Sequence, residues 1–128
     1  MNEALFWLYL TNAVLLINHE IDSAYWKEWD LFHLPGGIGG FLLLHFPLLF
    51  LVLYGMAAVS GQRPSAPWFS LLLCAGGIFA FSIHTYFLRK GRQEFDHPVS
   101  KGILWATLVV SLAQMAVSAV LLTTGKIA

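Results

Sequence analysis

Three histidines, His19, His45 and His84, each lie in or at the end of a separate long apolar segment of this 128-residue chain. An imidazole at membrane depth costs free energy, so three such residues indicate a functional site. Glu20 and Asp22, which closely follow the first histidine, add two carboxylates to the group. Together these residue types predict metal binding or acid–base chemistry.

The first apolar segment supplies a histidine and a carboxylate on one helix face. His19 and Asp22 are three residues apart and therefore share a face. Imidazole and carboxylate ligands suit zinc or non-haem iron, and two histidines with one carboxylate would leave a position open for substrate or oxygen. Zinc or iron is thus the expected cofactor. The predicted metal ligands are His19, Asp22, His45 and His84.

The same groups could carry out acid–base chemistry without a metal. Glu20 is turned about 100° from His19 at 3.6 residues per turn, which makes it the predicted general base or a hydrogen-bond partner of the ligands. His97 precedes the last apolar segment, where it could cap a cavity beside His84. The predicted catalytic residues are Glu20, Asp22 and His97, and in this case they would shuttle protons for an isomerase or a hydro-lyase.

Composition shows what must position these side chains. Hydrophobic residues make up 58% of the chain and charged residues 11%, and the mean hydropathy is +0.70. A membrane-spanning helix needs about 20 mainly apolar residues. Four such segments can be drawn, at 4–26, 37–59, 68–88 and 99–124. We predict an all-α, integral membrane four-helix bundle that forms one domain, residues 1–128, with both termini on the same side.

The basic residues predict the orientation of this bundle. The side that contains the first and third connections has Lys27, Arg89, Lys90, Arg92 and Lys101, and the other side has Arg63 and Lys126. The positive-inside rule places the richer side in the cytoplasm and both termini outside. We therefore predict a multi-pass protein of a bacterial inner membrane. All three histidines of the apolar segments then lie in the cytoplasmic half of the bundle.

Two further patterns predict how the helices pack. Gly76 and Ala80 form a pair of small residues on the third segment, which allows close contact between helices, and Gly77 broadens this surface. Polar residues three or four apart form a stripe along the fourth segment, at Thr107, Ser111, Gln114 and Ser118. We interpret this stripe as facing the interior of the bundle and forming hydrogen bonds between helices.

Residues 18–22 and 26–29, followed by His45 and His84, resemble small uncharacterised bacterial multi-pass membrane proteins, including those named for an HXXEE motif. In this chain Asp22 and Ser23 stand where that motif has two glutamates. The resemblance implies the same membrane architecture and a role for the motif of histidine and acid. It implies no assigned activity.

These observations favour a site of histidines and carboxylates that binds a metal and acts on a lipophilic small molecule entering from the bilayer. Histidine and acidic side chains also form proton or metal-ion pathways, so transport is an alternative. A non-catalytic accessory subunit of a membrane complex is another. The expected partners are the lipid bilayer, the lipophilic molecule, and a second copy or another membrane protein. A net charge of zero indicates no nucleic-acid partner.

Overall fold

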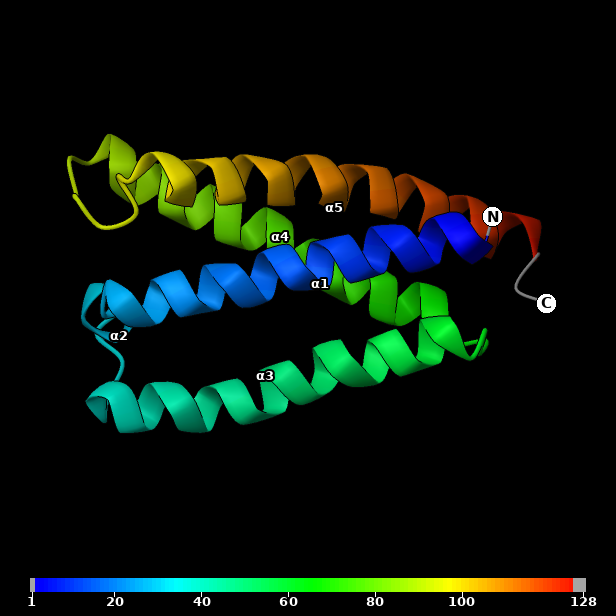
Figure 1. The fold of residues 1–128 in the computed structure, drawn as a ribbon, viewed down its shortest axis with the longest axis horizontal. Coiled ribbons are helices and arrows are strands. Elements are labelled where there is room, and N and C mark those ends of the chain that lie inside the picture. The colour runs from blue at the N-terminus through cyan, green and yellow to red at the C-terminus, as the bar shows by residue number, and fades with distance from the viewer. Residues whose placement is uncertain (1, 126–128) are drawn as a thin grey trace.

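The computed structural model describes residues 2–125 and contains no strand within them (Figure 1). Its helices are α1 (Asn2–Tyr25), α2 (Glu28–Leu31), α3 (Gly37–Ser60), α4 (Ala66–Arg89) and α5 (Pro98–Thr124). All of them except the short α2 are long and apolar enough to cross a membrane. The predicted all-α membrane bundle of four long helices is confirmed, and α2 is an additional element between the first two spans.

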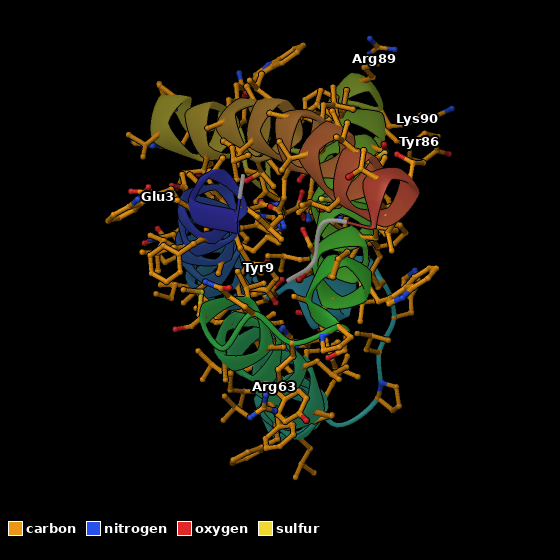
Figure 2. The ribbon with its side chains drawn as sticks, turned by 90° about the vertical axis from the view of Figure 1, so that its right-hand side faces the viewer. Glu3, Tyr9, Arg63, Tyr86, Arg89 and Lys90 are labelled. Carbon is orange, nitrogen blue, oxygen red and sulfur yellow. The ribbon has the colours of Figure 1, made fainter. Side chains whose placement is uncertain are left out.

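The four long helices form a bundle in which α1 and α4 separate α5 from α3. α5 packs against α1 and α4, α3 packs against the other side of the same two helices, and α3 does not contact α5. Figure 2 shows this arrangement along the bundle, from the end at which α1 begins and α5 ends. We call this the terminal end, and the opposite end, which contains α2 and residues 90–97, the loop end. α3 and α4 meet near the terminal end and separate toward the loop end (Figure 1).

The polar stripe of α5 points into the bundle, as predicted. Asn12 of α1 donates hydrogen bonds to Ser111 Oγ at 3.0 Å and to Gln114 Oε1 at 2.8 Å. Gln114 Nε2 donates to Ser70 Oγ of α4 at 2.8 Å, and Ser118 Oγ donates to the same oxygen at 2.7 Å. All five side chains are buried. This network joins α1, α4 and α5, whereas Thr107, the remaining residue of the stripe, is buried without a hydrogen-bond partner.

Small residues on α4 have two different roles. A Cβ added at Gly77 would lie 2.2 Å from Ser111 Oγ, so the close contact between α4 and α5 requires glycine there. A Cβ added at Gly76 would meet nothing within 4 Å. The predicted packing surface is therefore centred on Gly77, whereas Gly76 faces open space beside α3.

The loop before α5 folds back into the loop end. Phe95 has a left-handed backbone conformation, with φ at 68°, and its side chain is 1% exposed. Its ring centroid lies 3.9 Å from that of His84 and 5.5 Å from that of His19. A bulky residue adopts this conformation only where the surrounding structure enforces it. Phe95 thus closes the loop end over two of the predicted site residues.

Candidate metal centre

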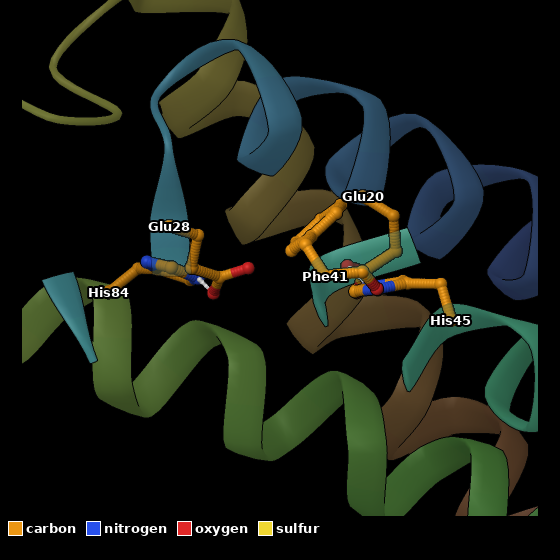
Figure 3. Close-up of polar contacts among 5 residues, drawn as sticks. All are labelled: Glu20, Glu28, Phe41, His45 and His84. Carbon is orange, nitrogen blue, oxygen red and sulfur yellow. Dashed lines mark hydrogen bonds and ion pairs between the residues drawn. The ribbon is translucent and has the colours of Figure 1, made fainter. Parts of the chain in front are cut away.

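Three side chains from three helices converge at the loop end: His19 of α1, Glu28 of α2 and His84 of α4. His84 Nε2 lies 3.1 Å from Glu28 Oε1, and the ring centroids of His19 and His84 are 4.6 Å apart. One potential ligand atom from each residue lies within 4.8 Å of the other two. Figure 3 shows Glu28 and His84 facing each other across the gap between α2 and α4. The cluster thus has the residue types and the spacing of a metal site.

Glu28 reaches the histidines because the chain turns sharply after α1. Lys27, with φ at 52°, adopts a left-handed conformation between α1 and the first residue of α2. Leu31 is buried, and the ring centroid of Trp29 lies 5.4 Å from that of Phe41 in α3. These contacts hold α2 against the bundle, so its first residue, Glu28, is positioned beside α4.

The polar atoms around this cluster have unused bonding capacity. His19 and His84 are 2% and 1% exposed, and the Nδ1 atom of each is buried without a hydrogen-bond partner. Ser23 Oγ, one turn after His19 on α1, and Trp26 Nε1, just after the end of this helix, also lack partners. A buried polar group left unpaired costs about 1–3 kcal/mol. A bound ion or polar ligand that reaches these atoms would offset this cost.

The donor set fits a transition metal. Two imidazoles and one carboxylate are a common ligand set for catalytic zinc and for non-haem iron, and both leave at least one position for water or substrate. Ligand bonds of 2.0–2.1 Å in a tetrahedral site place the ligand atoms about 3.3 Å apart. His84 Nε2 and Glu28 Oε1 form a hydrogen-bonded pair at 3.1 Å, and an ion held by both atoms would replace this bond.

The charge state of Glu28 suits the same role. Burial acts to raise the pKa of Glu28, but the hydrogen bond and charge of His84 outweigh it and hold the pKa below its usual value. The carboxyl group is therefore ionised at neutral pH. Metal ligation requires the deprotonated carboxylate, so no proton has to be displaced from Glu28 when an ion binds.

A second polar pair lies nearby, between α1 and α3. Glu20 Oε2 is 2.5 Å from His45 Nε2, and His45 Nδ1 is 2.6 Å from the carbonyl oxygen of Phe41 (Figure 3). A carbonyl oxygen can only accept a hydrogen bond, so His45 Nδ1 carries a proton. The short contact between Glu20 and His45 then holds one further proton, on either the carboxyl oxygen or Nε2. The pair has no net charge in either case.

Both groups open onto one cavity of about 570 Å³. Its walls come from α1, α2, α3 and α4, and its polar groups are His19, Glu20, Glu28, His45 and His84 at the loop end. Toward the terminal end the lining is apolar as far as Tyr9, whose hydroxyl donates a hydrogen bond to the Val52 carbonyl oxygen at 2.9 Å. Ligand pockets are commonly of this size and composition, mainly apolar with a few convergent polar groups.

The structure therefore divides the residues that the sequence grouped together. His19 and His84 share one cluster, and His45 pairs with Glu20 in the same cavity. Asp22 is half-buried and lines a separate surface cavity with His97. At 100° per residue, a separation of three leaves Asp22 turned about 60° from His19, which is enough to direct it away from α4. Glu28 takes the place in the cluster that the sequence analysis assigned to Asp22.

His97 also lies outside the main cavity. It is exposed and accepts a hydrogen bond at Nδ1 from the backbone N–H of Val99, at 3.2 Å, so it caps the start of α5. The position beside His84 where the sequence analysis placed it is occupied by Phe95.

Glu28 is the residue of the cluster that the sequence analysis did not select. One available signal is that Glu28 lies between Trp26 and Trp29, in a short connection whose aromatic residues favour folding back onto the bundle. The positive-inside rule does not require an acidic residue there. Such a residue between two membrane spans can be read as a ligand for histidines at the adjacent helix ends.

Apolar spanning helices around a buried cluster of histidine and glutamate define a multi-pass membrane protein with a polar internal site. The chain belongs to a family of unknown function (DUF6713), which matches residues 5–121. This membership agrees with the resemblance to uncharacterised proteins without an assigned activity. Among curated proteins and solved structures, none matches the chain.

Proposed function

We propose that the chain binds a divalent metal ion, zinc or iron, through His19, Glu28 and His84, and acts on a lipophilic small molecule in the adjoining cavity. The observation that carries this proposal is the convergence of three ligand atoms within 4.8 Å from three separate helices. The unpaired Nδ1 atom of His19 supports it, because an ion or ligand bound there would supply the missing partner.

In this proposal Glu20 and His45 handle protons. A bound zinc or iron ion supplies a Lewis acid, which polarises a substrate oxygen or lowers the pKa of a water molecule. Glu20 and His45 share one proton at the wall of the same cavity, so the pair can accept or donate a proton there. Because Asp22 and His97 lie at the surface outside this cavity, we assign them no catalytic role.

The orientation of the bundle completes the proposal. We infer that the loop end faces the cytoplasm of a bacterial cell, because five of the seven basic residues lie at that end. The metal cluster would then lie near the cytoplasmic surface of the inner membrane. Reporter fusions after Arg63 and after Arg92 test this orientation, since only the second should show cytoplasmic reporter activity.

The arrangement favours a blind pocket over a transport pathway. The buried polar groups of the middle of the bundle, centred on Gln114, are neutral and form hydrogen bonds with one another. A proton or ion pathway is usually continued by ionisable side chains. The ionisable groups of the cavity lie instead at the loop end, beside α2.

Elemental analysis of protein purified in detergent from metal-replete cells tests the metal site. We expect close to one zinc or iron ion per chain. His84→Ala should weaken binding by at least about 10-fold, since even groups that only support a ligand contribute that much. His97→Ala is the matched control, because this exposed histidine lies outside the cluster, and it should retain the metal.

The His45→Ala variant separates two ligand sets. It should retain the metal if Glu28 completes the site, and lose it if His45 is itself a ligand, as the sequence analysis predicted. Wild-type protein that contains no metal after metal-replete growth would overturn the proposed site and favour metal-free proton transfer or an accessory role.

A further inference from the structure

The cavity has two chemically different ends. Its imidazole and carboxylate groups all lie at the loop end, and the side chains farther along α3 and α4 are apolar. The Tyr9 hydroxyl at the opposite limit is already bonded to the Val52 carbonyl oxygen. A ligand that fills this cavity therefore needs one polar end and a long apolar remainder.

The length of the cavity matches a single hydrocarbon chain of one leaflet. On α3 its lining extends from Phe41 to Val52, which are 11 residues apart, or about 16 Å at 1.5 Å per residue. The hydrocarbon core of a bilayer is about 30 Å thick, so one leaflet accounts for about 15 Å. A chain of that length would extend from the polar cluster to the region of Tyr9.

The cavity opens sideways between α3 and α4. Leu48 of α3 and Leu72 and Phe79 of α4 line it and are also exposed on the outside of the bundle. These residues belong to two apolar spans, at membrane depth, so the opening faces lipid. Gly76 lies in the same wall and leaves it unobstructed, because a Cβ there would meet nothing within 4 Å.

Resting on the proposed metal site, we infer that the cavity binds a single-chain amphiphile of the fatty-acyl class. Its carboxylate or carbonyl oxygen lies at His19, Glu28 and His84, and its chain follows the opening between α3 and α4. A divalent ion with one carboxylate ligand leaves a charge of +1 at this end of the cavity. An anionic or electron-rich oxygen therefore complements the charge of the polar end.

A long-chain fatty acid with a diazirine midway along its chain tests this inference. The metal-loaded protein in lipid nanodiscs is irradiated with the probe, and the labelled residues are mapped by mass spectrometry. We expect labelling between Leu72 and Phe79 that an excess of unmodified fatty acid of the same length suppresses. Labelling of Val109 and Leu112, which are exposed on α5, should be weak and unaffected by the competitor.

Gly76→Trp should fill the opening and reduce the competed labelling at least about 10-fold. Gly102→Trp is the matched control, because a Cβ there also meets nothing within 4 Å and Gly102 does not line the cavity. Both variants should keep the metal, so loss of labelling with metal retained reports on the acyl site alone. A wild type without metal would instead count against the proposed function.

Two results would overturn the inference. One is labelling spread evenly over all lipid-facing helices and unaffected by the competitor. The other is the absence of labelling at the opening between α3 and α4, together with chemical cross-links that join this surface to a second copy of the chain. Such cross-links would show that another protomer covers the opening.

Discussion

The bundle contains two groups of buried polar residues that differ in how their hydrogen bonds are met. Between α1, α4 and α5, Gln114 bonds to Asn12 and to Ser70, and serines of α5 bond to the same two residues. At the loop end, His19 and His84 each keep a buried Nδ1 without a partner. In the sequence, both groups stand out as polar residues within apolar segments. The neutral, hydrogen-bonded group joins three helices, whereas the ionisable group keeps free bonding capacity, which the proposed binding site would use.

The largest expected effect on stability lies in the satisfied group. Gln114→Leu removes hydrogen bonds to Asn12 and Ser70 and leaves both of them buried without these partners. We expect the free energy of unfolding to fall by about 1–3 kcal/mol, because the stranded polar groups lose their compensation. Metal content should not change. Unfolding by SDS titration in mixed micelles measures the first quantity and elemental analysis the second.

A wild-type unfolding free energy in Gln114→Leu would contradict the structural role of the network. The variant Thr123→Val is a suitable control, since this exposed hydroxyl bonds only to carbonyl oxygens of its own helix.

The opposite result is expected at the loop end. His19→Leu replaces a buried imidazole, whose Nδ1 has no partner, by an apolar side chain of similar size. Without metal, the free energy of unfolding should stay within about 0.5 kcal/mol of the wild type or rise, since removing an unsatisfied polar group costs little. Metal binding should be lost. A large destabilisation of the metal-free protein would instead identify His19 as a packing residue.

The smallest effect is expected at the surface of the loop end. The pKa of Glu94 is lowered by a hydrogen bond from its own backbone N–H and by the Arg92 guanidinium, whose Nη2 donates to Oε1 at 2.7 Å. The Glu94 carboxylate is therefore protonated at a higher pH in the unfolded chain than in the folded chain. The stabilisation is present above the usual carboxyl pKa and is lost as the pH falls through the lowered one.

For this exposed pair the contribution should be about 0.2–1 kcal/mol at low salt and smaller at high salt. It is measured as the difference in unfolding free energy between wild type and Glu94→Gln at pH 7 and at pH 3. If the stability advantage of wild type over Glu94→Gln grew toward low pH, it would contradict a lowered pKa of Glu94 in the folded protein.

Much of the fold followed from local patterns. Hydropathy alone located the four spans, because a helix that crosses a bilayer needs an uninterrupted apolar length. The stripe through Ser111 and Gln114 predicted which face of α5 points inward, and the structure confirms it. Gly76 and Gly77 were both predicted to belong to the packing surface, but only Gly77 makes the close contact. Adjacent residues differ by 100° in direction, so small errors in helix rotation exchange such roles.

The site was less predictable from the same information. The depth of His19 and His84 in their segments placed them at one level, and the structure brings them together. The helix-face rule grouped Asp22 with His19, yet the two side chains enter different cavities. Glu28 was not selected because its position depends on the turn at Lys27, and a single left-handed residue in a connection leaves no periodic signal.

Residue types and their order along the chain thus determine that this protein has four apolar spans, polar groups at one end, and both ends of the described chain on one side. These properties depend on the transfer of each segment from water to lipid, which is a local quantity. The tertiary structure determines which carboxylate meets which histidine. That outcome depends on helix rotation, on the fold of α2 and on the insertion of Phe95, all of which arise from contacts between residues distant in sequence.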